Sequence, residues 1–246
     1  MLQAIDLKKT YSDGTKALED VSFNVEKGEI CSIIGPSGCG KSTLLFMFSC
    51  LLRPTSGKIL INNIEIKKPF KDGALILQDF GLFPWKTVYE NIAVGLKIRR
   101  CRRELINSIT CSMIKNLGLE GFEHHYPKQL SGGMQQKVGF ARVLALNPKI
   151  LFMDEPLSSL DAISREKLQN FLLDIWLKEK LTVLLVTHNI EEAVFLGKKI
   201  VVLSPRPAKV LKIIENHNAG DINYRNKIEF FEKCREIRNN IKLKVT

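Results

Sequence analysis

A glycine-rich loop with one lysine, GPSGCGKST (Gly35–Thr43), carries the clearest chemical pattern in the chain. It fits GxxxxGK[ST] between an apolar strand-like run and a helix-like run, which is the context in which this loop cradles phosphate. Closely spaced glycines allow backbone N–H groups to converge on one anion. Lys41 adds a point charge between two phosphates, and the Ser42 hydroxyl can ligate Mg²⁺. The loop therefore predicts a nucleoside triphosphate site, with Cys39 as a small residue at a variable position.

Two carboxylates end a later apolar run, ILFMDEP. A carboxylate at the end of a buried strand is costly unless it serves a metal, a proton or a partner. We expect Asp154 to hold Mg²⁺, directly or through water, and Glu155, facing the other way, to polarise an attacking water as general base. Helix capping or a surface ion pair is the alternative for this pair alone, but the phosphate loop upstream favours the metal and base roles.

Two further polar side chains follow predicted strands. His188 comes after TVLLVT. If that strand lies parallel beside the one that bears Asp154 and Glu155, the imidazole can contact the γ-phosphate or orient the water. Gln78 ends the predicted strand ALILQ, where a neutral amide can reach Mg²⁺ and the water through a mobile loop. Neither residue indicates a site by itself, because a lone histidine at a strand end is usually structural.

A second place for an anion is predicted at LSGGMQQ, Leu130–Gln136. Met134 to Leu146 carries apolar residues at helical spacing, so Ser131, Gly132 and Gly133 stand at a helix N-terminus. Glycine costs about 1 kcal/mol relative to alanine inside a helix, so the helix interior is an unfavourable place for the two glycines, Gly132 and Gly133. Free N–H groups at a helix N-terminus favour negative charge. The chain thus carries two segments suited to phosphate.

Strands that alternate with helices must position these side chains, which predicts an α/β core. Leu2 to Val25 alternates apolar and polar residues around a turn at Ser12-Asp13-Gly14, as antiparallel strands do. From Thr87 to about Leu146 the pattern is helical, which predicts a subdomain inserted into the core. Other predicted strands are GEICSII, KILIN, ALILQ, KILFM, TVLLVT, KIVVLS and KVLKII, and other predicted helices run from Lys41 to about Leu52, from Asp161 to about Lys178, and from about Tyr224 to Ile241.

The composition permits a large core and excludes several classes of protein. The chain has 246 residues, 45% of them apolar, and no apolar run approaches the ~20 residues of a transmembrane helix. Its six cysteines include no CxxC pair and no secretory signal opens the chain, which favours reduced thiols over disulfides or zinc. A net charge of +11 fits a polyanionic partner. We interpret the densest basic cluster, KIRRCRR at 97–103, as a solvated face in preference to a specific anion patch.

In combination, these segments resemble the nucleotide-binding subunit of an ABC transporter, over residues 1–205. Gly35–Thr43 is similar to the family's Walker A, Ile150–Glu155 to its Walker B, and Leu130–Gln136 to its signature, which other P-loop enzymes lack. Gln78 is similar to the Q-loop and His188 to the switch histidine. Ser158–Asp161 (SSLD) is similar to the D-loop, and Tyr11 to the aromatic residue that stacks on adenine, with ordinary packing of a strand-end tyrosine as the alternative.

The resemblance implies a set of site residues and a fold. The nucleotide would be bound by Tyr11, Gly35, Pro36, Ser37, Gly38, Cys39, Gly40, Lys41, Ser42, Thr43, Ser131, Gly132, Gly133, Gln135 and Asp161. The metal ligands would be Ser42, Gln78 and Asp154, and the catalytic residues Glu155, His188 and Gln78. The implied fold is a P-loop NTPase core with a mixed sheet and helices, an N-terminal antiparallel β subdomain and an inserted α-helical subdomain. Within a single nucleotide-binding domain (1–246), residues 1–79 and 147–205 would form the core, 80–146 the helical signature subdomain, and 206–246 a C-terminal strand and helix.

The resemblance also implies how the protein works. In this family two subunits pair head to tail, and each ATP, with Mg²⁺, lies between one subunit's Walker A and the other's signature. Ser131 and Gly133 would then bind the γ-phosphate of the partner's nucleotide, and Ser158 and Asp161 would cross the dimer seam. Hydrolysis removes the bridging phosphate and reopens the pair.

The implied partner is a transmembrane permease, gripped by the helical subdomain on the cytoplasmic face of the membrane, where the chain would be peripheral. Phe80, Phe83 and Trp85, in an exposed loop, could form half of that interface, with local packing as the alternative. FPWKTVYENIAVGL, LSGGMQQ and LSPRPAKV most resemble the nitrate, sulfonate and taurine importers, which use a separate permease and an extracytoplasmic solute-binding protein. We expect a small anionic solute, but members of this group also serve thiamine-precursor and other small-molecule systems, so the resemblance does not fix the cargo. Lys137 and Gly197-Lys198-Lys199 depart from the family's usual arginine and Ala-Asp-Arg.

Other ATPases with the same head are the alternative. A soluble DNA-repair or chromosome-structural ATPase would suit a basic chain. In those proteins a long coiled coil separates the Walker A from the signature, whereas here about ninety residues without heptads lie between the two segments. A translation-associated relative would carry two cassettes, and a small-molecule kinase would leave LSGGMQQ unexplained. A scaffold without hydrolysis would lack Glu155 or His188. We therefore expect no nucleic acid partner, and a soluble ABC-type ATPase acting on nucleic acid is the second hypothesis.

Overall fold

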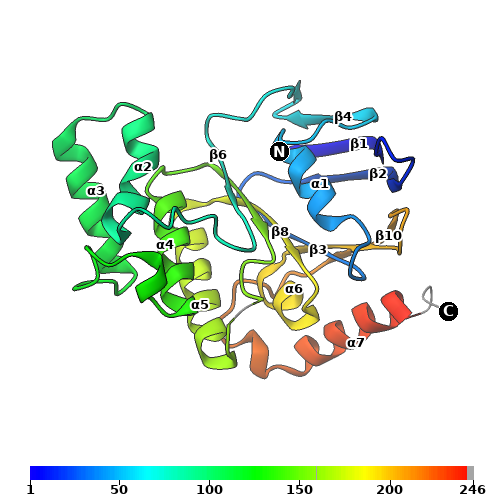
Figure 1. The fold of residues 1–246 in the computed structure, drawn as a ribbon. Coiled ribbons are helices and arrows are strands. Elements are labelled where there is room, and N and C mark those ends of the chain that lie inside the picture. The colour runs from blue at the N-terminus through cyan, green and yellow to red at the C-terminus, as the bar shows by residue number, and fades with distance from the viewer. Residues whose placement is uncertain (159, 243–246) are drawn as a thin grey trace.

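Two β-sheets form the framework of the protein, whose computed structural model describes residues 1–158 and 160–242 (Figure 1). The smaller sheet is antiparallel, in the order β2-β1-β4-β5, and consists of β1 (Leu2–Thr10), β2 (Lys16–Val25), β4 (Ser56–Ile61) and β5 (Ile64–Glu65). The larger sheet has the order β10-β9-β3-β8-β7-β6 and consists of β3 (Ile30–Ile34), β6 (Gly73–Ile76), β7 (Ile150–Asp154), β8 (Thr182–Thr187), β9 (Lys199–Leu203) and β10 (Val210–Glu215). Its neighbouring strands are parallel, except that β10 runs antiparallel to β9.

The parallel strands are buried on both faces, because helices cover one side and a helix with the antiparallel sheet covers the other. In β8, Val183 and Leu185 belong to one apolar core, while Leu184 and Val186 belong to the other. The same alternation runs through β3 and β7. Two-sided burial explains why these three strands read as continuous apolar runs in the sequence.

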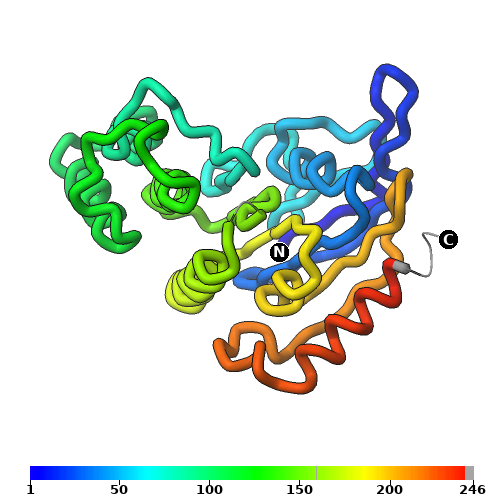
Figure 2. The backbone as a smooth tube through the Cα atoms, turned by 60° about the horizontal axis from the view of Figure 1, so that its bottom comes forward, coloured from blue at the N-terminus to red at the C-terminus, as the bar shows by residue number. Residues whose placement is uncertain are grey.

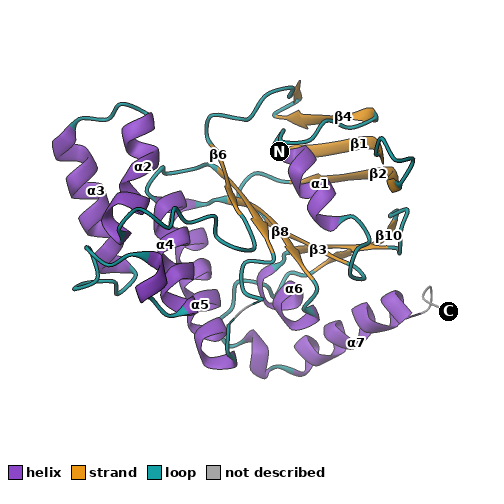
Figure 3. Ribbon diagram, in the orientation of Figure 1, coloured by secondary structure: helices purple, strands orange, loops and turns teal. Residues whose placement is uncertain are grey.

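The helices fall into three groups, which Figure 2 and Figure 3 separate in two views. On one face of the larger sheet, α1 packs together with the antiparallel sheet; its bounds are Lys41–Phe48. The other face is covered by α5 (Ala162–Glu179), α6 (Ile190–Leu196) and α7 (Ile228–Lys242). A third core lies among α2 (Val88–Ile98), α3 (Arg103–Asn116) and α4 (Gly132–Leu144). Because Phe140 and Val143 of α4 join the core of the larger sheet, α4 connects the helical group to the strands.

The α/β class, the antiparallel N-terminal strands and the helical character of residues 87–146 are confirmed. Some elements end elsewhere than predicted. α1 stops at Phe48 instead of about Leu52, because Cys50 takes a left-handed φ of +57° that a helix cannot continue. The predicted helix from Tyr224 begins as a short 3₁₀ turn, Tyr224–Asn226, and α7 starts after it. Within residues 1–158 and 160–242, every helix is too short or too polar to span a membrane.

The segment after β6 differs from the prediction in two ways. β6 ends at Ile76, so Gln78 lies in an exposed turn and not at the strand end. The prediction that Phe80 is exposed is wrong, because this side chain is only 8% exposed. Phe80 packs closely on α4: a Cβ added at Gly139 would lie 2.9 Å from the Phe80 Cβ. Phe83 is half-buried, and only Trp85, at 68%, is strongly exposed.

A buried amide holds the chain between β6 and α2 in place. Asn91, on α2, is fully buried. Its Nδ2 donates to the carbonyls of Phe83, Lys86 and Thr87 at 3.1, 2.9 and 3.0 Å, and its Oδ1 accepts from the Phe83 N–H at 2.9 Å. One side chain thus satisfies four polar groups of the loop that presents Trp85.

Replacing Asn91 by alanine should destabilise the protein by about 2–4 kcal/mol, because several buried polar groups lose their partner together. Urea unfolding followed by circular dichroism measures this loss. Asn116→Ala, at an exposed position on α3, is the matched control and should stay within about 0.5 kcal/mol of the parent. Equal stability of the two variants would contradict the role given to Asn91.

Candidate functional site

The phosphate loop joins β3 to α1 and depends on a glycine at its end. Gly40 has a φ of +121°, and a Cβ there would lie 2.9 Å from the Ala17 carbonyl oxygen. Only glycine fits such a position, and α1 begins directly after it, with its free N–H groups towards the loop. Lys41 is buried, and its Nζ donates to the carbonyls of Gly35 and Pro36 at 3.0 Å each. The ammonium is therefore held inside the loop.

Ser42 and Asp154 meet at the edge of this loop. The Ser42 hydroxyl donates to Asp154 Oδ1 at 2.9 Å, from two residues that are 112 positions apart in the chain. Asp154 ends β7 and is 5% exposed. Burial raises the pKa of its carboxyl group; the Ser42 hydrogen bond opposes this rise and the nearby Glu155 adds to it. A buried carboxylate of this kind is stabilised by a cation.

The donor atoms fit Mg²⁺, which prefers hard oxygen ligands and binds proteins through one or two carboxylates together with phosphate oxygens and water. A hydroxyl and a carboxylate oxygen stand side by side here. Among the described residues, no cluster of three or more His, Cys, Asp and Glu side chains could form a complete metal cage. A cation at Ser42 and Asp154 would thus need further oxygen ligands, such as those of phosphate and water.

Glu155 and His188 form a pair next to that position. β7 and β8 are parallel neighbours, with Asp154 opposite Val186, as the role of His188 requires. The Glu155 N–H donates to the Val186 carbonyl at 2.9 Å, and Glu155 has a φ of +45°, an uncommon conformation for a residue with a side chain. Glu155 Oε2 lies 2.8 Å from His188 Nδ1, and the imidazole is exposed. This carboxylate–imidazole pair can accept and orient a water molecule.

Tyr11 lies at the other end of the loop. Its hydroxyl oxygen is 3.0 Å from Thr43 Oγ1, and Lys9 Nζ lies 5.4 Å from the centre of its ring. The ring is 39% exposed. The ring therefore lies partly exposed beside the phosphate loop.

Arg206 is a contact of the phosphate loop that the sequence analysis missed. Its Nε and Nη2 donate to the Gly38 carbonyl at 3.1 and 2.7 Å. Arg206 follows β9, which lies next to β3 in the sheet, so the contact depends on strand order. The only sequence signal was the PRP turn after KIVVLS, which carries no chemical pattern of its own.

The segment Leu130–Gln136 stands at a helix N-terminus, as predicted. α4 begins at Gly132, and Ser131 is its N-cap, accepting from the Met134 N–H at 3.4 Å. Gln135 Nε2 donates to the carbonyls of Pro127 and Leu130 at 3.0 and 3.3 Å, so this amide shapes the preceding loop.

Within one chain, the start of α4 is separate from the phosphate loop. Figure 1 and Figure 2 agree that α4 and α1 lie apart. Ser131 and Gly133 line a cavity of about 350 Å³ together with Lys137 and residues of α5. No hydrogen bond within residues 1–158 and 160–242 joins Ser131, Gly132 or Gly133 to the phosphate loop.

The remaining predicted residues lie at turns and helix ends. Asp161 is the N-cap of α5 and accepts from the Ser164 N–H at 3.0 Å. The Ser158 hydroxyl donates to the Glu155 carbonyl at 3.0 Å, while Ser159, in the same predicted D-loop, lies outside the described residues. Gln78 is exposed, and its side chain makes no hydrogen bond to any other described residue. The structure therefore does not bring Gln78 to Asp154 within one chain.

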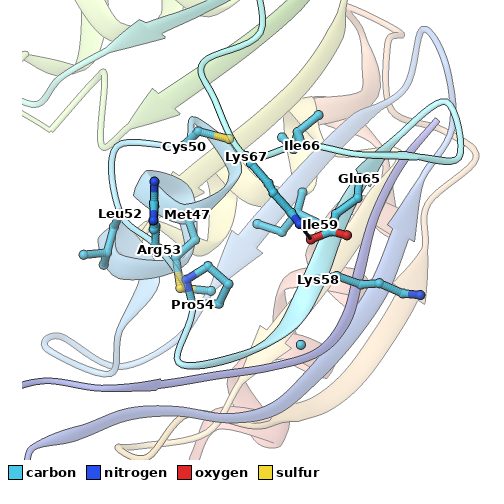
Figure 4. A pocket seen from close by; sticks show the side chains of 11 residues that line it. Met47, Cys50, Leu52, Arg53, Pro54, Lys58, Ile59, Glu65, Ile66 and Lys67 are labelled. Carbon is cyan, nitrogen blue, oxygen red and sulfur yellow. Dashed lines mark ion pairs between the residues drawn. The ribbon is translucent and has the colours of Figure 1, made fainter.

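The cavity in Figure 4 is lined by none of the predicted site residues. It has a volume of about 330 Å³ and lies between the end of α1 and strands β4 and β5, with Met47 and Ile59 in its wall. Lys67 reaches towards Glu65, 3.5 Å away, and Lys58 points away from the cavity (Figure 4). The cations around it do not converge on one point.

This fold and site define a P-loop ATPase, and comparison with known proteins identifies its family. The family described as "ABC transporter" matches residues 18–158, more than half of the chain. An uncharacterized ABC transporter ATP-binding protein of Methanocaldococcus jannaschii is 45% identical over 229 residues, 92% of this chain and 85% of that protein. The taurine import ATP-binding protein TauB of Yersinia pestis is 40% identical over 239 residues, 97% and 91% of the two chains. The aliphatic sulfonates import ATP-binding protein SsuB of Bacillus cereus is 42% identical over 214 residues, 86% and 84% of the two.

Solved structures agree with these relatives. The dimeric post-hydrolysis state of the ATP-binding cassette MJ0796, bound to ADP and Pi, matches with a TM-score of 0.79 at 34% identity, over 88% of this chain and 99% of that one. CbiO1 of Clostridium perfringens, part of the ABC transporter complex cbiONQ, matches with a TM-score of 0.80 at 27% identity, over 97% and 93%. The chain belongs to the ABC transporter family and, as an ATP-binding subunit of it, hydrolyses ATP.

Replacing Arg206 by alanine should weaken ATP binding about threefold to tenfold, because a charged donor that holds the Gly38 carbonyl is lost at an exposed position. Titration with a fluorescent ATP analogue measures this change. Lys209→Ala is the control: Lys209 pairs with Glu19 at 3.0 Å nearby. Equal affinities for both variants would exclude Arg206 from loop positioning.

Proposed function

We propose that two copies of this chain bind two ATP molecules head to tail, and that hydrolysis drives a membrane permease which imports a small anionic solute. One observation carries the proposal: the two segments suited to phosphate lie apart within one chain (Figure 1 and Figure 2). Lys41, Ser42, Asp154, Glu155 and His188 gather at one edge of the sheet, while the second phosphate-type segment stands apart at the start of α4. A second copy can supply that segment, and the dimeric ADP-bound neighbour supports this arrangement.

In the proposed reaction, Lys41 and the loop N–H groups hold the β- and γ-phosphates of ATP. Ser42 and Asp154 would hold Mg²⁺, joined by Gln78 once its turn moves inward; the bound ion neutralises charge on the phosphates. Glu155 accepts the proton of the attacking water, and His188 keeps that water and Glu155 aligned.

Other residues recognise the rest of the nucleotide. Tyr11 stacks on adenine, and the remaining loop residues bind phosphate through their backbone. From the opposite subunit, Ser131, Gly132 and Gly133 meet the γ-phosphate at a helix N-terminus, where negative charge is favoured. Gln135 shapes that segment, and Asp161 lies at the seam between subunits.

The partners follow from the exposed surface and from the relatives. Trp85 stands exposed in a loop fixed by Asn91, which suits a rigid contact with a permease. We propose that residues 80–146 act as the arm for this contact, beside the core of 1–79 and 147–205 and the C-terminal segment 206–246. The chain would then be peripheral, on the cytoplasmic face of the membrane.

The proposed cargo is a sulfonate, taurine, nitrate or a similar solute, delivered by a solute-binding protein. TauB and SsuB, the relatives named above for taurine and aliphatic sulfonates import, support this class over nucleic acid.

Replacing Glu155 by glutamine should lower kcat at least about a hundredfold, because the amide cannot take the proton of the water. ATP binding should persist, so size-exclusion chromatography with ATP should reveal a stable dimer. Glu191→Gln, an exposed neighbour on α6, should behave like the parent. Hydrolysis at the parental rate in Glu155→Gln would remove Glu155 from the base role.

Two inactive variants should complement each other. Ser131→Arg blocks the segment at α4, and Lys41→Ala disables the phosphate loop, so each alone should lose hydrolysis. Mixed in equal amounts, they should regain about one quarter of parental activity, because half of the random dimers are mixed and each has one intact site. Full activity of Ser131→Arg alone, or of a strictly monomeric chain, would contradict the divided site.

A further inference from the structure

A buried carboxylate lies directly behind His188 and has no role in the proposed reaction. Glu192, on α6, is 3% exposed. Its Oε2 accepts a short hydrogen bond from the Thr187 hydroxyl, while its Oε1 is buried without a hydrogen-bond partner among the described residues. Burial raises the pKa of Glu192 to about 7, although Thr187, Arg165 and His188 oppose that rise. Burying a carboxyl group with one oxygen unpaired costs stability, so we expect Glu192 to have a function that offsets this cost.

The contacts of Glu192 fix both sequence neighbours of His188. The Thr187 hydroxyl, which donates to Glu192, also accepts from the Asn189 N–H at 3.0 Å. The Glu192 N–H in turn donates to Asn189 Oδ1 at 3.0 Å. The contacts of Glu192 therefore hold the backbone on both sides of His188. The Nδ1 of this imidazole lies 2.8 Å from Glu155 Oε2.

Arg165, on α5, carries a positive charge that opposes the rise in the pKa of Glu192. Its Nη2 and Nε donate to the carbonyls of Leu160 and Leu157 at 2.8 and 3.4 Å. These carbonyls belong to the segment that joins Glu155 to the N-cap of α5. A guanidinium has five N–H donors, so Arg165 can hold that segment and still attract the carboxylate.

We propose that Glu192 is a positioning residue for His188: its contacts hold Thr187 and Asn189 on either side of the imidazole that faces Glu155. This inference rests on the proposed function, because it takes His188 to align the water. A role only in capping α6 would leave catalysis unchanged at equal stability.

The test compares the kinetics of variants around Glu192. Glu192→Ala should lower kcat about tenfold to a hundredfold, since small misplacements of a catalytic group have effects of this size, with the KM for ATP within about twofold. Glu192→Gln keeps an acceptor for Thr187 and should recover most of the loss. Thr187→Val should reproduce the defect and Thr187→Ser should not, which keeps the test valid if Glu192→Ala fails to fold. Glu191→Gln is the control on the same helix.

A double-mutant cycle separates this inference from the proposed function. In a His188→Ala background, Glu192→Ala should change kcat by less than about twofold, because both act through one imidazole. If His188→Ala lowers kcat and Glu192→Ala lowers it further by its full factor, the positioning role is overturned and the role of His188 stands. If His188→Ala keeps the parental kcat, the role of His188 fails, and the inference fails with it.

Discussion

The parallel pairing of β3, β8 and β7 is the constraint on which the site depends. The register sets Ile34 opposite Thr187 and Val186 opposite Asp154, so three strands end at one edge of the sheet. Each strand contributes a different group there: the phosphate loop, His188, and the Asp154–Glu155 pair. Because all three strands are buried on both faces, a slip of one residue would exchange the two apolar cores, and the register is strongly held.

α4 connects this edge to the helical group, although its N-terminus lies away from the phosphate loop. Gln136 is fully buried and its Nε2 donates to the Pro156 carbonyl, directly after Glu155. Six residues further on, Arg142 donates to the carbonyls of Phe80 and Gly81, in the segment after Gln78. Buried polar contacts of this kind are costly to break. α4 therefore links the end of β7 to the segment that leads to Trp85.

A divided site gives a physical reason for two phosphate-binding segments in one chain. Within one chain the N-terminus of α4 lies away from the phosphate loop (Figure 1), so in the proposed dimer it can meet the nucleotide of the partner. In this proposed arrangement, two copies would close when triphosphate joins them and would separate when the γ-phosphate leaves. ATP would then be both the substrate and a part of the interface.

The sequence alone determined the local features of this protein. The glycines, lysine and serine of 35–43 lie close together in the chain and need only a strand and a helix beside them, so their pattern predicts the loop directly. The N-cap at Ser131 and the continuous apolar strands are equally local. Tertiary structure decided which distant side chains meet. The contacts of Arg206 with Gly38, of His188 with Glu155 and of Phe80 with α4 join residues 168, 33 and about 60 positions apart, where no spacing rule applies. Strand order and helix packing set these contacts, because burial is a property of the whole core and not of a short segment.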